Sequence, residues 1–479
     1  MEVAASVPAL NAGPERHIGR SLELEEAPLE HFAGMEHEAI EDNVVFFPGE
    51  DYDEQDEENQ PLEHFNLRVI FNPKRNVLEE SVNFRIEADS IIAGSYRIVD
   101  YLGSGVFSRA VQCVEMATGR MVCIKIIRNN KDFFDQSLGE IKLLRRLNAA
   151  DPNDAHNVLR MYDHFYHKEH LFIVCELLRD NLYELYKYIQ RNDWTPYFTL
   201  PRIRAIAHQC LTALAFIHAN NLIHCDLKPE NILIKSLSKC IVKVIDFGSS
   251  CFRSDPHSSY VQSRSYRAPE VVLGLPYNAK IDVFSLGCIL AELHRGRVLF
   301  SNKTVTHLLA GHTALCGEVK PWMIDEGKHA HLYFRRRQLY MWQEEPSEAG
   351  LQHDERHGTP TSQRRQRHVE HGTGRYCYVH PRRRTFEAEL GTDDALFVDF
   401  IRQLLTLDLH ERPSAEQALR HPWLTTATQP CAPLYQPHVP DDSTAPPEPY
   451  APPPRASTAT LGGGGGSSGG GGSSSGGGG

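Results

Sequence analysis

Four polar side chains in the middle of this 479-residue chain have the types and the spacing that phosphoryl transfer requires. Asp226 is followed by Lys228 and then by Asn231, and an Asp-Phe-Gly triplet begins further along at Asp246. The Asp226 carboxylate is suited to orient a hydroxyl nucleophile, and the Lys228 amine to neutralise charge on a γ-phosphate. The amide of Asn231 and the carboxylate of Asp246 are oxygen ligands of the kind that Mg²⁺ prefers. The order of these residues predicts chemistry that depends on ATP and Mg²⁺.

The elements that must hold the phosphates are predicted upstream. Gly103 and Gly105 lie in a turn between two apolar strands, where absent side chains let the backbone approach a phosphate. Ser108 replaces the third glycine of the usual G-x-G-x-x-G, so the turn by itself also fits an ordinary hairpin. A strand ends at Lys125, and fifteen residues later Glu140 opens a segment with helical apolar spacing. Each charge alone fits a solvated surface position, but as a pair they would aim Lys125 at the α- and β-phosphates.

Composition excludes several classes of protein. The eleven cysteines are scattered, with no C-x-x-C pair, which argues against a zinc site or a disulfide scaffold. No apolar run approaches the roughly 18 residues of a membrane span. Residues 1–10 lack the basic start and apolar core of a secretory signal. We therefore expect a protein of the cytoplasm and/or nucleus that does not contact membranes.

The charge of the chain is concentrated in one region. Residues 21–60 hold fifteen acidic residues and no Lys or Arg, so the net charge of −12 leaves about +3 for the remainder. Bulk charge therefore does not suggest direct nucleic-acid binding. The acidic region is expected to be disordered, and the alternative is a docking or autoregulatory arm for a basic surface.

Apolar periodicity predicts the main elements. A buried strand is expected over residues 171–178, and strand-like alternation occurs over 64–71 and 82–86. Helices are expected over 182–188, 202–220 and 281–293, the last being apolar on nearly all sides and therefore buried. The polar, His-rich residues 343–371 indicate a surface insertion.

Several motifs resemble one family closely. They are the His-Cys-Asp triplet that ends at Asp226, the activation-segment sequence from Ser259 to Glu270, and the helix over residues 283–293. Together they resemble the dual-specificity tyrosine-regulated kinases, the DYRK family of the CMGC protein kinases. Residues 125–136 and 258–270 are most similar to its plant-type branch. The resemblance covers about residues 65–424, fails across the insertion, and is absent from both tails.

The resemblance implies an α+β, bilobal protein kinase fold, with a small β-rich N-lobe and a larger, mainly helical C-lobe. The kinase domain would span residues 96–424, with the N-lobe over about 96–178 and the C-lobe over 179–424. Residues 63–95 are expected to form a short extension that packs on the N-lobe, after the acidic region of 1–62. Residues 425–479 are Pro-rich and then Gly- and Ser-rich, and we expect them to be disordered.

The resemblance also assigns roles to residues. Asp226 would be the catalytic base, supported by Lys228, Lys125 and Glu140, with Asn231 and Asp246 as the Mg²⁺ ligands. Glu176 and Leu178 would lie in the hinge that binds adenine, Cys175 at the gatekeeper position, and Val111, Cys123 and Leu233 around the adenine ring. Glu270 and Arg412 resemble a structural ion pair, and Asp282 a brace of the catalytic loop. The expected nucleotide contacts are Leu102, Gly103, Gly105, Val111, Cys123, Lys125, Cys175, Glu176, Leu178 and Leu233.

Regulation is expected at the activation segment. Cys225 stands where many kinases have an Arg that binds a loop phosphate, so the partners of that phosphate must come from elsewhere. Arg264 and Arg267 follow Tyr260, and two guanidinium groups could bind a phosphotyrosine there. In the family the matching Tyr is autophosphorylated, and the mature enzyme then modifies Ser and Thr. The simpler alternative is a packed Tyr260 beside ordinary surface charges.

The same motifs bear on the substrate. Lys228 follows the pattern of Ser/Thr kinases, and the position of Arg267 is associated with a pocket for Pro after the target residue. Protein substrates with Ser or Thr, Pro-directed, are therefore the expected partners. The alternative from another class is a pseudokinase or scaffold, supported by Phe284 where Trp is usual and by the unusual residues 310–316. The full set of Lys125, Asp226, Asn231 and Asp246 favours the enzyme.

Overall fold

The computed structural model describes residues 22–26, 46–47, 64–74, 81–192, 197–258, 260–300, 303–344 and 374–426. Most of the acidic region and nearly all of the predicted insertion, together with the Gly- and Ser-rich tail, lie outside the described residues. Within the acidic region two short strands are described. β1 (Leu22–Glu26) pairs with β17 (Gly374–Pro381), and β2 (Phe46–Phe47) pairs with β14 (His257–Ser258).

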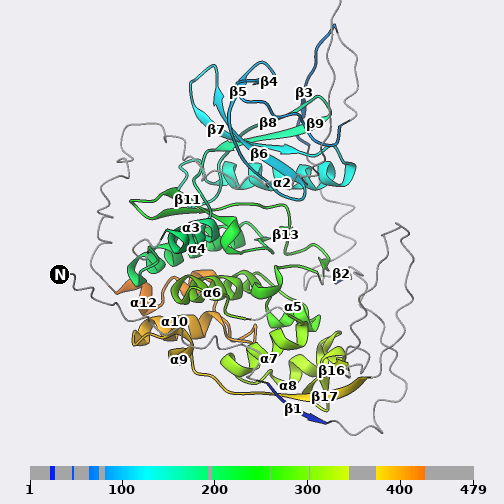
Figure 1. The fold of residues 1–479 in the computed structure, drawn as a ribbon, viewed down its shortest axis with the longest axis vertical. Coiled ribbons are helices and arrows are strands. Elements are labelled where there is room, and N and C mark those ends of the chain that lie inside the picture. Colours follow the sequence, from blue (N-terminus) through cyan, green and yellow to red (C-terminus); the bar gives the residue numbers. More distant parts are fainter. Residues whose placement is uncertain are drawn as a thin grey trace, which may run out of the picture. The chain divides into compact units, whose positions relative to one another are not determined.

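A seven-stranded sheet forms the β-rich part, in the order β3-β8-β9-β7-β6-β5-β4. All of its strand pairs are antiparallel except β3 with β8. The helix α2 (Lys131–Ala150) lies beside this sheet in Figure 1 and begins at Asn130, whose side chain accepts hydrogen bonds from the first free backbone N–H groups. The strands are β3 (Arg68–Ile70), β4 (Ile91–Ile92), β5 (Tyr96–Ser104), β6 (Ser108–Glu115), β7 (Met121–Ile127), β8 (Met161–His167) and β9 (His170–Glu176).

The extension before Tyr96 contributes β3 and β4 to this sheet. The strand expected over residues 82–86 is wrong, because no strand is formed there. Val82 is exposed, whereas Phe84 and Ile86 pack against the sheet: the ring of Phe84 lies edge-on to Phe172 with centroids 5.2 Å apart. At Phe84 and Ile86 the apolar alternation therefore reflects burial against the sheet and not strand pairing.

The helical part is built around α4 (Leu200–Ala219) and α6 (Lys280–Arg295), which lie against each other in Figure 1. The predicted helices over 182–188, 202–220 and 281–293 are confirmed, with ends shifted by three residues or fewer. The other helices are α3 (Leu182–Arg191), α5 (Pro269–Leu273), α7 (Val305–Cys316), α8 (Pro321–Glu326), α9 (Phe386–Leu390), α10 (Ala395–Leu404), α11 (Ala415–Ala418) and α12 (Pro422–Thr425).

Short strands connect these helices. The hairpin of β11 and β12 begins directly after Asn231, so it follows the loop that carries Asp226 and Lys228. The strands are β10 (Leu222–Ile223), β11 (Ile232–Ser236), β12 (Ile241–Val244), β13 (Cys251–Phe252), β15 (Phe334–Arg335) and β16 (Gln338–Glu344). The predicted α+β architecture, with a β-rich part and a larger, mainly helical part, is thus confirmed. In the part of the chain that the structure describes, no helix is long and apolar enough to cross a membrane.

Candidate active site

A fully buried carboxylate holds the loop that carries Asp226. Asp282, on α6, accepts hydrogen bonds from the backbone N–H groups of His224 at 2.8 Å and Cys225 at 3.0 Å. The backbone at Cys225 has a φ of 64°, a left-handed conformation that costs energy for a residue with a side chain. The two bonds to Asp282 maintain this turn, which places Asp226 next to Lys228.

The carboxylate of Asp226 is held from two sides. One oxygen accepts a hydrogen bond of 2.5 Å from the Lys228 amine. The other accepts bonds from the hydroxyl of Ser263 at 2.8 Å and from its backbone N–H at 3.1 Å. Ser263 belongs to the activation segment and was not predicted, because no local spacing links it to a residue 37 positions away. The activation segment therefore contacts the predicted base directly.

The residues predicted to hold Mg²⁺ fit that ion chemically. The side-chain N–H of Asn231 donates to the backbone oxygen of Asp226 at 2.9 Å, which leaves the amide oxygen of Asn231 for another partner. Burial would raise the pKa of Asp246, but the nearby Lys125 and His224 hold it below its ordinary value. Asp246 is consequently ionised at neutral pH. An amide oxygen and a carboxylate are ligands that a hard divalent cation takes.

The predicted ion pair between strand and helix is formed. The Lys125 amine lies 2.7 and 2.9 Å from the two carboxylate oxygens of Glu140, and 3.6 Å from Asp246. Burial alone would lower the pKa of Lys125, yet these carboxylates raise it above its ordinary value, so the amine is charged. The side chain of Gln136 also joins α2 to the site, because it donates to the Gly248 oxygen at 2.9 Å. Its position one helical turn before Glu140 is the signal that could have found it.

The glycine turn lies over open space. A Cβ atom added at Gly103 or at Gly105 would meet no atom within 4 Å. The Gly105 N–H bonds to the Ser108 oxygen at 2.9 Å, which closes the turn. Leu102 and Phe107 at the two sides of the turn are exposed apolar side chains. This is the form expected of a loop that covers a ligand.

Two thiols and a leucine lie where adenine is expected. Cys123 and Cys175 are directly opposite each other on β7 and β9, so their side chains point to the same face of the sheet. Burial raises the pKa of Cys123 to about 11 and that of Cys175 above its ordinary value, so both thiols are neutral. Leu233 on β11 is half-buried, and Glu176 and Leu178 follow at the end of β9.

The prediction for Val111 is wrong. Val111 pairs with Ile124, has no exposed surface, and belongs to the apolar cluster on the far face of the sheet from Lys125. Ala110 pairs with Lys125 and therefore takes the face assigned to Val111. Side chains alternate along a strand, so an error of one residue in counting from the glycine turn moves the assignment to the opposite face.

Of the predicted regulatory residues, Arg267 lies against Tyr260. Tyr260 is 60% exposed, and the guanidinium carbon of Arg267 lies 5.2 Å from the centre of its ring. Arg267 donates to the backbone oxygens of Val261 and Gln262, each at 2.9 Å. Arg264 is exposed. Cys225 is fully buried, as its lack of charge allows.

Comparison with known proteins agrees with this geometry. The family model described as "Protein kinase domain" matches residues 96–424. The match covers more than half of the chain, and the chain therefore belongs to the protein kinase domain family.

The chain is similar to several curated kinases, including proteins named as DYRK-family kinases. It is 38% identical to "Serine/threonine-protein kinase ppk15" of Schizosaccharomyces pombe, over 70% of this chain and 62% of that protein. It is 41% identical to "Dual specificity protein kinase YAK1" of Saccharomyces cerevisiae, over 50% and 30%. With "Dual specificity tyrosine-phosphorylation-regulated kinase 4" of Homo sapiens it shares 35% identity over 70% and 58%. The chain thus spans less than two thirds of the length of each of these curated relatives.

Proposed function

We propose that this protein transfers the γ-phosphate of ATP to Ser and Thr residues of protein substrates. The observation that carries the proposal is that the structure forms two groups of charged side chains, one around Lys125 and one around Asp226. Lys125 lies between Glu140 and Asp246, and Asp226 is held ready between Lys228 and Ser263. The motifs in residues 125–136 and 258–270 further support the plant-type branch of the DYRK family, which a phylogenetic tree of kinase domains would test.

In this mechanism the residues of the chain position the substrate hydroxyl and stabilise the negative charge of the phosphates. Asp226 accepts the hydrogen bond of the substrate hydroxyl and takes its proton as the phosphate is transferred. Lys125 binds the α- and β-phosphates, while Lys228 neutralises charge on the transferred group. Asn231 and Asp246 would hold Mg²⁺, which supplies further neutralisation of the phosphates when bound.

A transfer assay with radiolabelled ATP and a Ser-containing peptide tests the proposal. We expect Asp226→Asn to lower the rate by about 10²- to 10⁴-fold, since general-base catalysis contributes that much. A wild-type protein that transfers no more label than Asp226→Asn would instead favour the scaffold alternative. Nucleotide binding alone would not distinguish the two, because a scaffold can retain it.

We propose in addition that the protein phosphorylates its own Tyr260. The exposure of Tyr260 and the Arg267 guanidinium over its ring support this, because a phosphate there would gain a charged partner. Mass spectrometry of the purified protein should find phosphate on Tyr260, and Tyr260→Phe should lower activity. Fully active protein without that phosphate would contradict the proposal.

The preference for Pro after the target residue has support in the backbone of Gln262. Its N–H donates to the Cys225 oxygen at 2.8 Å, and its carbonyl oxygen is occupied by Arg267 at 2.9 Å. The φ of 65° at Gln262 fixes this orientation. A substrate residue with an N–H finds that acceptor already taken, whereas Pro has no N–H to satisfy. Peptides with Ser-Pro should be phosphorylated about tenfold faster than those with Ser-Ala, and equal rates would contradict the proposal.

A further inference from the structure

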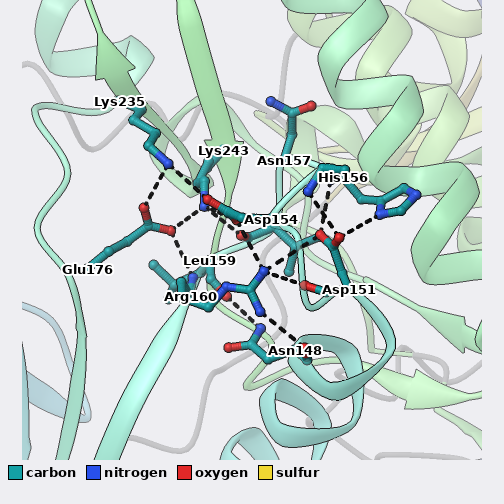
Figure 2. A network of polar contacts seen from close by, with 12 residues as sticks. Asn148, Asp151, Asp154, His156, Asn157, Leu159, Arg160, Glu176, Lys235 and Lys243 are labelled. Carbon is teal, nitrogen blue, oxygen red and sulfur yellow. Dashed lines mark hydrogen bonds and ion pairs between the residues drawn. The ribbon is translucent and has the colours of Figure 1, made fainter.

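A second group of charged side chains lies outside the catalytic machinery, behind the hinge (Figure 2). It brings together the loop that follows α2, the end of β9 and the β11–β12 hairpin. Its charges balance, with three basic and three acidic side chains. We call this group the back-hinge cluster; its members are Asp151, Asp154, Arg160, Glu176, Lys235 and Lys243.

Lys243 is the centre of the back-hinge cluster. Its side chain is only 2% exposed. The amine donates to Asp154 at 2.5 Å, to the backbone oxygen of Val158 at 3.1 Å, and to the carboxylate of Glu176. These contacts use all three N–H groups of the ammonium. In Figure 2 dashed lines join the Glu176 carboxylate to the amines of both Lys243 and Lys235.

The contacts of Glu176 fix the hinge from behind. Its carboxylate accepts from the Arg160 N–H at 2.8 Å, and its own N–H donates to the Arg160 oxygen at 2.9 Å. Further along the hinge, the Arg179 N–H donates to Ile234 at 2.8 Å, and the Ile234 N–H donates to Asp180 at 3.1 Å. The segment expected to receive adenine is therefore held at both of its ends by β11 and by the loop after α2.

The loop after α2 provides a rigid support. Val158 forms an isolated parallel bridge with Val244 of β12, next to hydrogen bonds from Leu159 to Val244 at 3.1 Å and from Val244 to Asn157 at 2.8 Å. Burial would raise the pKa of Asp154, but hydrogen bonds from Lys243 and Lys235 hold it below its ordinary value. Asp154 thus stays ionised as a partner of Lys243.

We propose that Lys243 is a positioning residue for the nucleotide site: by holding the Glu176 carboxylate behind the hinge, it sets the affinity for ATP and not the rate of phosphoryl transfer. This inference rests on the proposed function, because the hinge binds adenine only in a nucleotide site. The physical reason is the state left when the amine is removed. The buried carboxylate of Glu176 and the half-buried carboxylate of Asp154 then lose the one buried cation between them. Lys235 still contacts both, but it is 42% exposed and lies 3.5 Å from Glu176, so it offsets their repulsion only in part and the end of β9 is displaced.

The experiment compares Lys243→Met with Lys239→Met, a matched change of an exposed lysine in the turn of the same hairpin. We expect Lys243→Met to raise the calorimetric Kd of a non-hydrolysable ATP analogue and the KM for ATP about tenfold, with kcat changed less than twofold. Lys239→Met should leave all three unchanged. Hydrogen exchange at residues 176–180 should also become faster in Lys243→Met only.

A purely structural role gives a different result. Lys243→Met would then lower the thermal midpoint, and kcat through the folded fraction, while Kd and KM stayed at the wild-type values; that outcome overturns the inference.

Glu176→Gln, which keeps the shape of the side chain, provides a second test if Lys243→Met does not fold, and it should raise Kd in the same direction. In the double variant the two effects on Kd should be less than additive, because both act through one contact. A wild-type protein that binds the analogue without transferring phosphate would refute the proposed function while leaving the Kd comparison valid.

Discussion

Two ion pairs in this molecule each join a basic side chain to a glutamate, but they differ in their exposure to solvent. Arg412 binds Glu270 through hydrogen bonds of 2.6 and 2.9 Å, and both side chains are fully buried. Lys125 binds Glu140 at 2.7 and 2.9 Å, but the Lys125 side chain is 27% exposed. The first pair joins α5 to the chain after α10, and the second joins β7 to α2 beside the glycine turn.

The difference lies in how many donors each cation has left. Arg412 also donates to the backbone oxygens of Thr406, Lys280 and Leu407, so all five of its N–H groups are used. The hydrogen bonds of Lys125 within the described residues go to Glu140, and its distance of 3.6 Å to Asp246 is too long for a further one. A saturated pair specifies the fold, whereas a pair with a donor to spare can bind a phosphate.

The largest expected effect tests the Lys125–Glu140 pair, which is partly exposed to solvent. Lys125→Met should lower kcat/KM by about 10³-fold, because it removes a charge aimed at the phosphates. The accompanying loss in the free energy of unfolding should be smaller than that of Arg412→Met, since solvent reaches this site. Phosphate transfer and urea unfolding measure the two quantities. Lys131→Met, an exposed lysine at the start of α2, is the matched control and should change neither.

The fully buried Arg412–Glu270 pair should show the opposite result, a loss of stability without a change in nucleotide binding. Arg412→Met leaves the Glu270 carboxylate buried without a partner, so the free energy of unfolding should fall by about 3–5 kcal/mol. The KM for ATP of the folded fraction should not change. Urea unfolding measures the loss, and the double variant Arg412→Met/Glu270→Leu should recover most of it. A similar loss in the double variant would show that the neighbouring backbone contacts, and not the charge, carry the stability.

The same comparison explains what could be predicted from the sequence. Asp226, Lys228 and Asn231 lie within six residues, and one turn of chain brings them together, so spacing alone revealed them. Ser263 reaches Asp226 across 37 residues, and Lys243 reaches Glu176 across 67. Such contacts depend on how whole elements pack, which local patterns do not encode.

Strand periodicity set a second limit. It identified the strands around Lys125 correctly, but it placed Val111 on the wrong face. Ala110 and Val111 are adjacent apolar residues, and only Ala110 pairs with Lys125. The two unusual features noted in the sequence, Phe284 and residues 310–316, prove to be one feature. The ring of His312 lies edge-on to Phe284, with centroids 5.2 Å apart.

His312 offers the prediction with the smallest expected effect. It lies in the buried region that also holds Arg412. It is fully buried between Phe284 and Phe300, and within the described residues neither of its ring nitrogens has a hydrogen-bond partner. Burial, assisted by the charge of Arg412, lowers the pKa of His312 to about 3. Between that value and about 6.5 the unfolded chain binds a proton that the folded protein does not, so stability is lost as pH falls through this range.

For wild type this one group should lower the free energy of unfolding by about 2 kcal/mol between pH 8 and pH 5. His312→Leu removes that contribution, so the variant should lose correspondingly less stability over the same range, and at pH 8 it should be at least as stable as wild type because two unsatisfied nitrogens are gone. Urea unfolding at both pH values measures the difference, in which the carboxylates common to both proteins cancel. His331→Gln, an exposed histidine, should keep the wild-type pH dependence. Equal losses in wild type and His312→Leu would mean that water or a proton reaches His312, and that the region around Arg412 is not sealed.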